Sequence, residues 1–228
     1  MEIRRGFFVK QNDGDFMGEY DVKNHKVMQK MDKNKLDTFI EVAMKEFAKG
    51  YVVANTDDIA KEAGISKGLI FHYFGSKKGL YLFLIKYALD IVNTQYDTVV
   101  LEDKNFLDNI ERVSRLSIEL TVEYPTIYRF LLKSYLSLDD VFTEGLPEDI
   151  YNASESVAKR VLRYSDKSLF RDDIDVEKAQ DIIIWTMNGL VNRILTLGKE
   201  MSDFQSHFDP LMEEFEAYLN VFRLTFYK

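Results

Sequence analysis

The sequence predicts an all-α fold, and three observations carry this prediction. Apolar residues recur at three- and four-residue steps through most of the chain after residue 35. No segment shows the alternation of apolar and polar residues that is typical of a half-buried strand. Glycines and capping residues divide the pattern into short segments before residue 76 and longer ones after it. We therefore expect a three-helix N-terminal domain followed by a helical bundle.

The first helix is expected to start near residue 35, because residues 1–31 are polar, mixed in charge and without sustained periodicity. We expect these 31 residues to form a flexible N-terminal extension or a loosely docked arm. Leu36, Phe39, Ile40 and Ala43 then recur at helical spacing, and Gly50 ends the helix.

Two short helices and one long helix should follow. Residues 55–58 place a capping hydroxyl and two acidic side chains at the start of the second helix, and Gly64 ends that helix. Ser66 is expected to cap the third helix, which Gly75 ends. Ser76 should cap a long fourth helix. Further amphipathic runs lie at about residues 105–124, 125–138, 148–165, 175–200 and 205–227.

Composition excludes several classes of function. The 228 residues contain no cysteine and three histidines, so we expect no disulfide, no metal site and no cofactor. No apolar run is long enough for a membrane span or a signal peptide, which predicts a cytoplasmic protein with no membrane partner. No nucleophile–base pair or phosphate-binding glycine loop is discernible, so we expect no enzymatic activity.

The charges are unevenly distributed along this acidic chain. The net charge is −8, yet residues 63–89 contain no acidic residue and four lysines. The negative excess lies entirely after residue 90, where 25 acidic residues face 15 basic ones. A surface that binds phosphate excludes carboxylates and gains from lysine, because lysine displaces condensed counterions. The window therefore indicates a nucleic-acid surface; the alternative is an ordinary solvated face.

Residues 56–77, which overlap this window, have the features of a helix-turn-helix. Such a motif needs two short helices at a steep angle, a small residue and a glycine at the turn, and apolar anchors under the second helix. Ala63 and Gly64 supply the turn and Ile65 fills the junction, while Ile70 and Phe74 anchor the second helix. The opposite face of that helix is left for the major groove.

Residues 56–77 resemble the DNA-binding signature of the TetR family of bacterial transcriptional regulators. The resemblance covers residues from about 35 to 86. It implies a DNA-binding domain at residues 32–78 and a domain for ligand binding and dimerisation at residues 79–228. Phe71 replaces the tyrosine common in the family, and Lys78 and Gly79 replace its frequent glutamates. The residues expected to contact DNA are Thr56, Ser66, Lys67, Gly68, Leu69, His72, Tyr73, Ser76, Lys77 and Lys78. For Tyr73 a half-buried core position is the alternative.

The resemblance also implies a homodimer that binds a small-molecule effector. The expected seam is formed by the last two helices through Ile184, Leu190, Val191, Ile194, Phe208, Met212, Phe215 and Leu219; the alternative is that these residues form an intramolecular core. Because ligand pockets are mostly apolar with a few polar groups, the expected effector-binding residues are Tyr87, Phe106, Tyr124, Tyr128, Tyr135, Trp185 and Asn188. The alternative is that the aromatic residues among them form core instead of lining a cavity.

These expectations combine into one function. The chain is expected to be a transcriptional regulator, in the first place a repressor, which binds a pseudo-palindromic double-stranded DNA operator as a dimer. A small, largely apolar ligand would release it. The alternative is a ligand-independent helix-turn-helix protein whose C-terminal body only dimerises.

Overall fold

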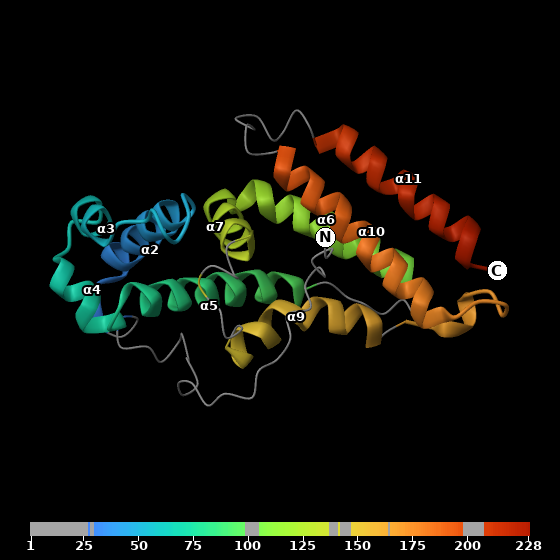
Figure 1. Cartoon of the computed structure of the whole chain (residues 1–228), viewed down its shortest axis with the longest axis horizontal. Helices are drawn as coiled ribbons and strands as arrows, with labels where there is room; N and C mark the ends of the chain where they lie inside the picture. Colours follow the sequence, from blue (N-terminus) through green and yellow to red (C-terminus); the bar gives the residue numbers. More distant parts are fainter. Residues whose placement is uncertain are drawn as a thin grey trace. The chain divides into compact units, whose positions relative to one another are not determined.

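The computed structural model describes residue 27 and residues 30–98, 105–136, 141, 147–163, 165–197 and 208–228. In this part of the chain the all-α prediction is confirmed, and the only β-type pairing is an isolated bridge between Phe170 and Tyr227. No helix there combines the length and the hydropathy that a membrane span requires. The helices are α2 (Lys33–Phe47), α3 (Thr56–Glu62), α4 (Lys67–Phe74), α5 (Lys77–Tyr96), α6 (Phe106–Glu123), α7 (Pro125–Leu136), α9 (Glu148–Arg163), α10 (Val176–Leu197) and α11 (Phe208–Phe226) (Figure 1).

The chain forms two compact units. One contains the described residues up to Gln95 together with Glu123–Glu155, and the other contains Tyr96–Val122 and Ser156–Lys228. The first unit therefore holds α2, α3, α4, nearly all of α5, and α7. Val27, from the predicted N-terminal extension, is fully buried in its core. The domain boundaries expected at residues 31 and 78 stay predictions.

An aromatic cluster fills the core of the first unit. The ring of Phe47 lies 5.0 Å from that of Tyr81 and 6.5 Å from that of Phe130, so the cluster joins α2, α5 and α7. Tyr51, in the loop after α2, lies 5.0 Å from Tyr81. Burial raises the pKa of the Tyr81 hydroxyl to about 12. Because these rings share one core, α7 and the loop before α3 pack against the same aromatic cluster.

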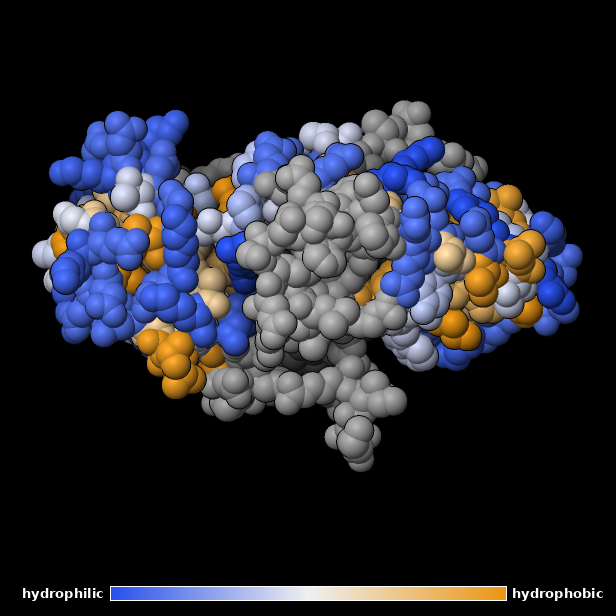
Figure 2. Space-filling view, turned by 90° about the horizontal axis from the view of Figure 1, so that it is seen from above, coloured by the Kyte–Doolittle hydropathy of each residue, from blue (hydrophilic) through white to orange (hydrophobic). Residues whose placement is uncertain are grey.

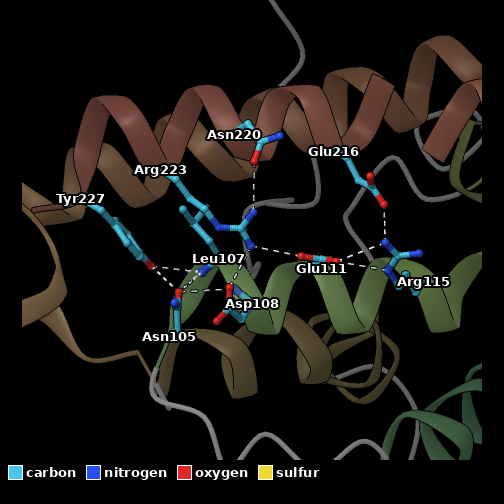
Figure 3. A network of polar contacts seen from close by, with 9 residues as sticks. All are labelled: Asn105, Leu107, Asp108, Glu111, Arg115, Glu216, Asn220, Arg223 and Tyr227. Atoms are coloured by element: carbon cyan, nitrogen blue, oxygen red, sulfur yellow. Dashed lines mark hydrogen bonds and ion pairs between the residues drawn. The ribbon is translucent and has the colours of Figure 1, made fainter. Parts of the chain in front are cut away.

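The second unit packs α10 against α11 around Phe106, Phe170, Ile183 and Leu219. A polar network joins α6 to α11 at its edge (Figure 3). Its central group is the Arg223 guanidinium, which lies 2.9 Å from Asp108 and 3.1 Å from Glu111. Arg115 bridges Glu111 to Glu216, and the Tyr227 hydroxyl donates to Asn105 at 2.9 Å. The network therefore ties α6 to α11 along several turns.

Candidate nucleic-acid interface

The turn between α3 and α4 has the geometry that the sequence predicts. Gly64 has a φ of +65°, a conformation that favours glycine because it has no Cβ. The amide of Ile65 donates to the Ala60 carbonyl at 3.0 Å, and that of Gly64 donates to Lys61 at 3.3 Å. This pair of hydrogen bonds is the Schellman motif, which ends a helix and redirects the chain. The cap of α3 differs from expectation: the Asn55 amide oxygen, rather than the Thr56 hydroxyl, accepts from Asp57.

Helix α4 is capped by Ser66, whose hydroxyl accepts from the Leu69 amide at 3.2 Å, as expected. Ile70 and Phe74 are buried, and the Phe74 ring lies 5.7 Å from Phe39 and 5.0 Å from Phe83. These contacts hold α4 against α2 and α5. The remaining face of α4 is therefore turned outward and kept in a fixed orientation.

The structure brings most of the residues expected to contact DNA to this outward surface. Leu69, Tyr73 and Lys77 are half-buried, which agrees with a partly packed Tyr73. Thr56, at the start of α3, is buried, unlike the other residues expected to contact DNA. The exposed members of the expected set are Ser66, Lys67, Gly68, His72, Ser76 and Lys78.

Two of the lysines have acceptors within the chain. The Lys67 ammonium lies 2.9 Å from the Asp57 carboxylate, with both side chains about half exposed. The Lys77 ammonium donates to the Val52 carbonyl at 3.3 Å and lies 4.9 Å from the centre of the Tyr51 ring. Sequence reasoning missed both partners, because each lies far from its lysine along the chain. The ammonium groups of Lys67 and Lys77 therefore each contact an oxygen atom of a distant residue of the same unit.

The start of α5 lies very close to the end of α4. The Ser76 hydroxyl accepts from the Gly79 amide at 2.9 Å, so Ser76 is the expected cap. A Cβ added to Gly79 would lie 2.0 Å from the Phe74 carbonyl oxygen. Gly79, which the sequence marks only as a departure from the family pattern, is therefore required for this close approach.

The buried carboxylate of Glu46 holds the loop that leads into α3. It accepts from the Asn55 amide at 3.0 Å and pairs with the Lys49 ammonium. Burial raises the pKa of Glu46, but the Lys49 and Asn55 hydrogen bonds and the charges of Lys49 and Lys77 outweigh it and lower the pKa below its ordinary value of 4.5. Glu46 therefore stabilises the fold as a carboxylate.

Replacing Glu46 by glutamine is expected to lower the free energy of unfolding at pH 7 by about 1 to 2 kcal/mol, because the charged hydrogen bond to Lys49 is lost. A lowered pKa in the folded state stabilises above the ordinary value of 4.5, and this stabilisation disappears as the pH falls through the folded-state pKa. The difference between the two proteins should therefore shrink below pH 4.5 in urea unfolding curves. Glu41→Gln, which removes an exposed ion pair with Lys45 on the same helix, should change little; equal effects of the two substitutions would contradict this role.

The residues expected to bind an effector are divided between the two units. Tyr87, Tyr124, Tyr128 and Tyr135 are half-buried and belong to the first unit. Phe106 is fully buried in the core of the second unit, while Trp185 is 55% exposed. The side chain of Asn188 lies outside the described part of the structure.

The residues expected at the dimer seam lie largely inside the second unit. Leu190, Met212, Phe215 and Leu219 are buried in its core, and Ile184 is partly buried against it. They cover one another because α10 and α11 pack together within the chain. The side chains of Val191, Ile194 and Phe208 lie outside the described residues. Among the described side chains of α10 and α11, the large apolar ones that are exposed are Ile182, Trp185, Val221 and Leu224.

A short capped helix presented outward by buried anchors, next to lysines and a helix N-terminus, defines a helix-turn-helix DNA-binding protein. Residues 39–83 match the family model "Bacterial regulatory proteins, tetR family". Relatives include the transcriptional repressor AcnR of Corynebacterium efficiens, 28% identical over 72% of this chain and 83% of that protein. Another is the biofilm operon negative regulator IcaR of Staphylococcus aureus, 23% identical over 65% and 77%.

Among solved structures, a TetR family regulator from Chloroflexus aurantiacus superimposes with a TM-score of 0.65 at 17% identity, covering 89% of this chain and 97% of that one. This structure therefore has the same fold as the present chain beyond the helix-turn-helix as well. The family match over residues 39–83, the relatives and the structural neighbours together support a TetR-family transcriptional regulator.

Proposed function

We propose that this regulator is a dimeric repressor in the bacterial cytoplasm that reads a pseudo-palindromic operator through α4 and the start of α5. The observation that carries the proposal is the outward face of α4. Ile70 and Phe74 anchor the helix, while Lys67, Gly68 and His72 are exposed on it. Such a face combines hydrogen-bonding groups with a residue that permits close backbone approach to base edges. The negative regulators AcnR and IcaR support repression as the direction of control.

The experiment that tests this function is selection of binding sites from random duplex DNA with the purified protein. We expect a single inverted repeat with half-site centres about 34 to 36 Å apart, or a multiple of this spacing. A reporter gene placed behind that repeat should be expressed less when the protein is present. Recovery of unrelated sequences, or increased reporter expression, would contradict the proposal.

Dimerisation through the outer faces of α10 and α11 is part of the proposal. Ile182 and Trp185 are three residues apart on α10, and Val221 and Leu224 are three apart on α11, so each pair lies on one helix face. Figure 2 shows hydrophobic atoms among hydrophilic ones on the surface of the unit that ends at the C-terminus, at the right. Leu224 is 85% exposed, and a second copy of the same face would bury it.

Helix α5 is the element proposed to transmit the effector signal. It begins at Lys77 beside the DNA-reading helix, and its last residue, Tyr96, belongs to the second unit. The Tyr96 hydroxyl lies 2.6 Å from Ser117 on α6. Arg160, on α9, donates to the Tyr96 carbonyl at 3.2 Å and to Asp97 at 2.6 Å. A shift of α6 or α9 on ligand binding would therefore act on the far end of α5.

The proposed effector is a small, largely apolar molecule bound in the C-terminal body. The ligand-independent alternative is favoured by one observation: Phe106 is fully buried among core side chains, while Trp185 is 55% exposed. Native mass spectrometry of the purified protein, followed by operator binding with and without any molecule it carries, separates the two. Unchanged operator affinity in the presence of a bound molecule would contradict effector control.

Asp57→Asn is expected to raise the affinity for duplex DNA of any sequence by about threefold to tenfold at low salt. The Asp57 carboxylate lies 2.9 Å from the Lys67 ammonium, so it repels phosphate and competes with it for the lysine. Removing a charge at such a distance in water should change the free energy of DNA binding by about 1 kcal/mol or less. Fluorescence anisotropy titrations against a labelled random duplex measure the change.

Asp58→Asn is the matched control, because it removes the same charge from the neighbouring exposed position of α3. It should raise the affinity less than Asp57→Asn does. Equal effects of the two variants, or weaker binding by Asp57→Asn, would show that the Lys67–Asp57 pair does not compete with DNA.

A further inference from the structure

An aromatic side chain lies exposed on the DNA-reading face. Phe71 is 38% exposed on α4, although its neighbours Ile70 and Phe74 on the same short helix are buried. A phenyl ring has no donor or acceptor, so Phe71 gains nothing from contact with a phosphate oxygen.

The surroundings of Phe71 leave its ring accessible. Lys67 lies one turn earlier, with its ammonium 6.0 Å from the centre of the ring. Gly68, three residues before Phe71, has no side chain, and a Cβ added there would meet nothing nearer than Ser66 Oγ at 4.0 Å. The Phe71 ring therefore lies beside a part of α4 that has no side chain at Gly68, and a base edge can approach the helix there.

We propose that Phe71 reads thymine, by packing its ring against the C5-methyl group of one thymine in each half-site. This inference rests on the proposed function as an operator-binding protein. The thymine methyl group is the apolar feature of the major groove, and an apolar side chain recognises it by contact. The other base edges there present donors and acceptors, which a phenyl ring cannot satisfy. Phe71 is thus a specificity-determining residue.

The test replaces each thymine of the selected operator, one position at a time, by deoxyuridine, which lacks only the methyl group. At one thymine per half-site we expect the affinity to fall about fourfold, the effect of one buried methyl group. Replacing the symmetry-related thymine as well should lower it about fifteenfold.

Phe71→Ala should bind the thymine operator more weakly than the unchanged protein and should not respond to the deoxyuridine replacement. Phe71→Leu keeps an apolar side chain and should retain the response, and thermal unfolding of both variants checks that they fold. Failure to bind any duplex would refute the proposed function itself. Binding that is indifferent to every thymine methyl group, or a response that persists in Phe71→Ala, would overturn the role of Phe71 and leave the operator function intact.

Discussion

Gly79→Ala is expected to lower the free energy of unfolding by about 3 kcal/mol and to abolish specific DNA binding. The added Cβ would lie 2.0 Å from the carbonyl oxygen of Phe74, a distance that no stable contact allows. The opposing atom belongs to the backbone, so no side-chain rotation relieves the clash. Overpacking of this kind costs about 1 to 3 kcal/mol, and here α4 itself must move. Urea unfolding and operator titration measure the two effects.

Gly68→Ala is the matched control, because it adds the same methyl group to a helical glycine of the same unit. The nearest atom to that Cβ is 4.0 Å away, and alanine is the better helix former, so stability should stay unchanged or rise by up to about 1 kcal/mol. Operator binding should nevertheless weaken, because Gly68 is exposed on the face of α4 that is proposed to read DNA. Wild-type stability of Gly79→Ala would show that α4 and α5 are not held at this distance.

Leu224→Glu is expected to convert the proposed dimer to a monomer and to lower operator affinity at least about a hundredfold. Leu224 is 85% exposed on α11, so its replacement removes little packing within the chain. In the proposed dimer each copy would bury a carboxylate without a partner, and the two half-sites would then be bound independently. Sedimentation velocity measures the oligomeric state, and anisotropy titrations measure the affinity.

Ser168→Glu is the control for this prediction, because it adds the same charge at an exposed position of the same unit outside α10 and α11. It should leave the oligomeric state unchanged. A Leu224→Glu protein that remains dimeric with full operator affinity would place the seam elsewhere on the molecule.

The helix-turn-helix could be predicted because its determinants are local. Gly64 ends α3 with the expected turn, and Ser66 and Ser76 cap the next two helices through hydrogen bonds to residues three positions away. The apolar spacing also separates the buried Ile70 and Phe74 from the exposed Lys67 and His72. Each of these features depends on neighbours within one helical turn, so the amino-acid pattern is sufficient to predict it.

The details of the interface could not be predicted, because they depend on residues distant in sequence. Lys67 pairs with Asp57, and Lys77 reaches Val52 across 25 positions of the chain. Glu46 holds the Asn55 amide nine positions away. No spacing rule links such positions, because the turns between the helices decide which side chains meet.

In the second unit, the amino-acid pattern predicts that α10 and α11 are rich in apolar residues, but packing within the folded chain selects which of these residues form the core. Leu190, Phe215 and Leu219 are buried, whereas Trp185 and Leu224 remain exposed. A helix with apolar residues on two faces has the same composition whichever face packs inward. The choice depends on which neighbouring helix fills the space, and packing between distant segments of the chain alone decides this.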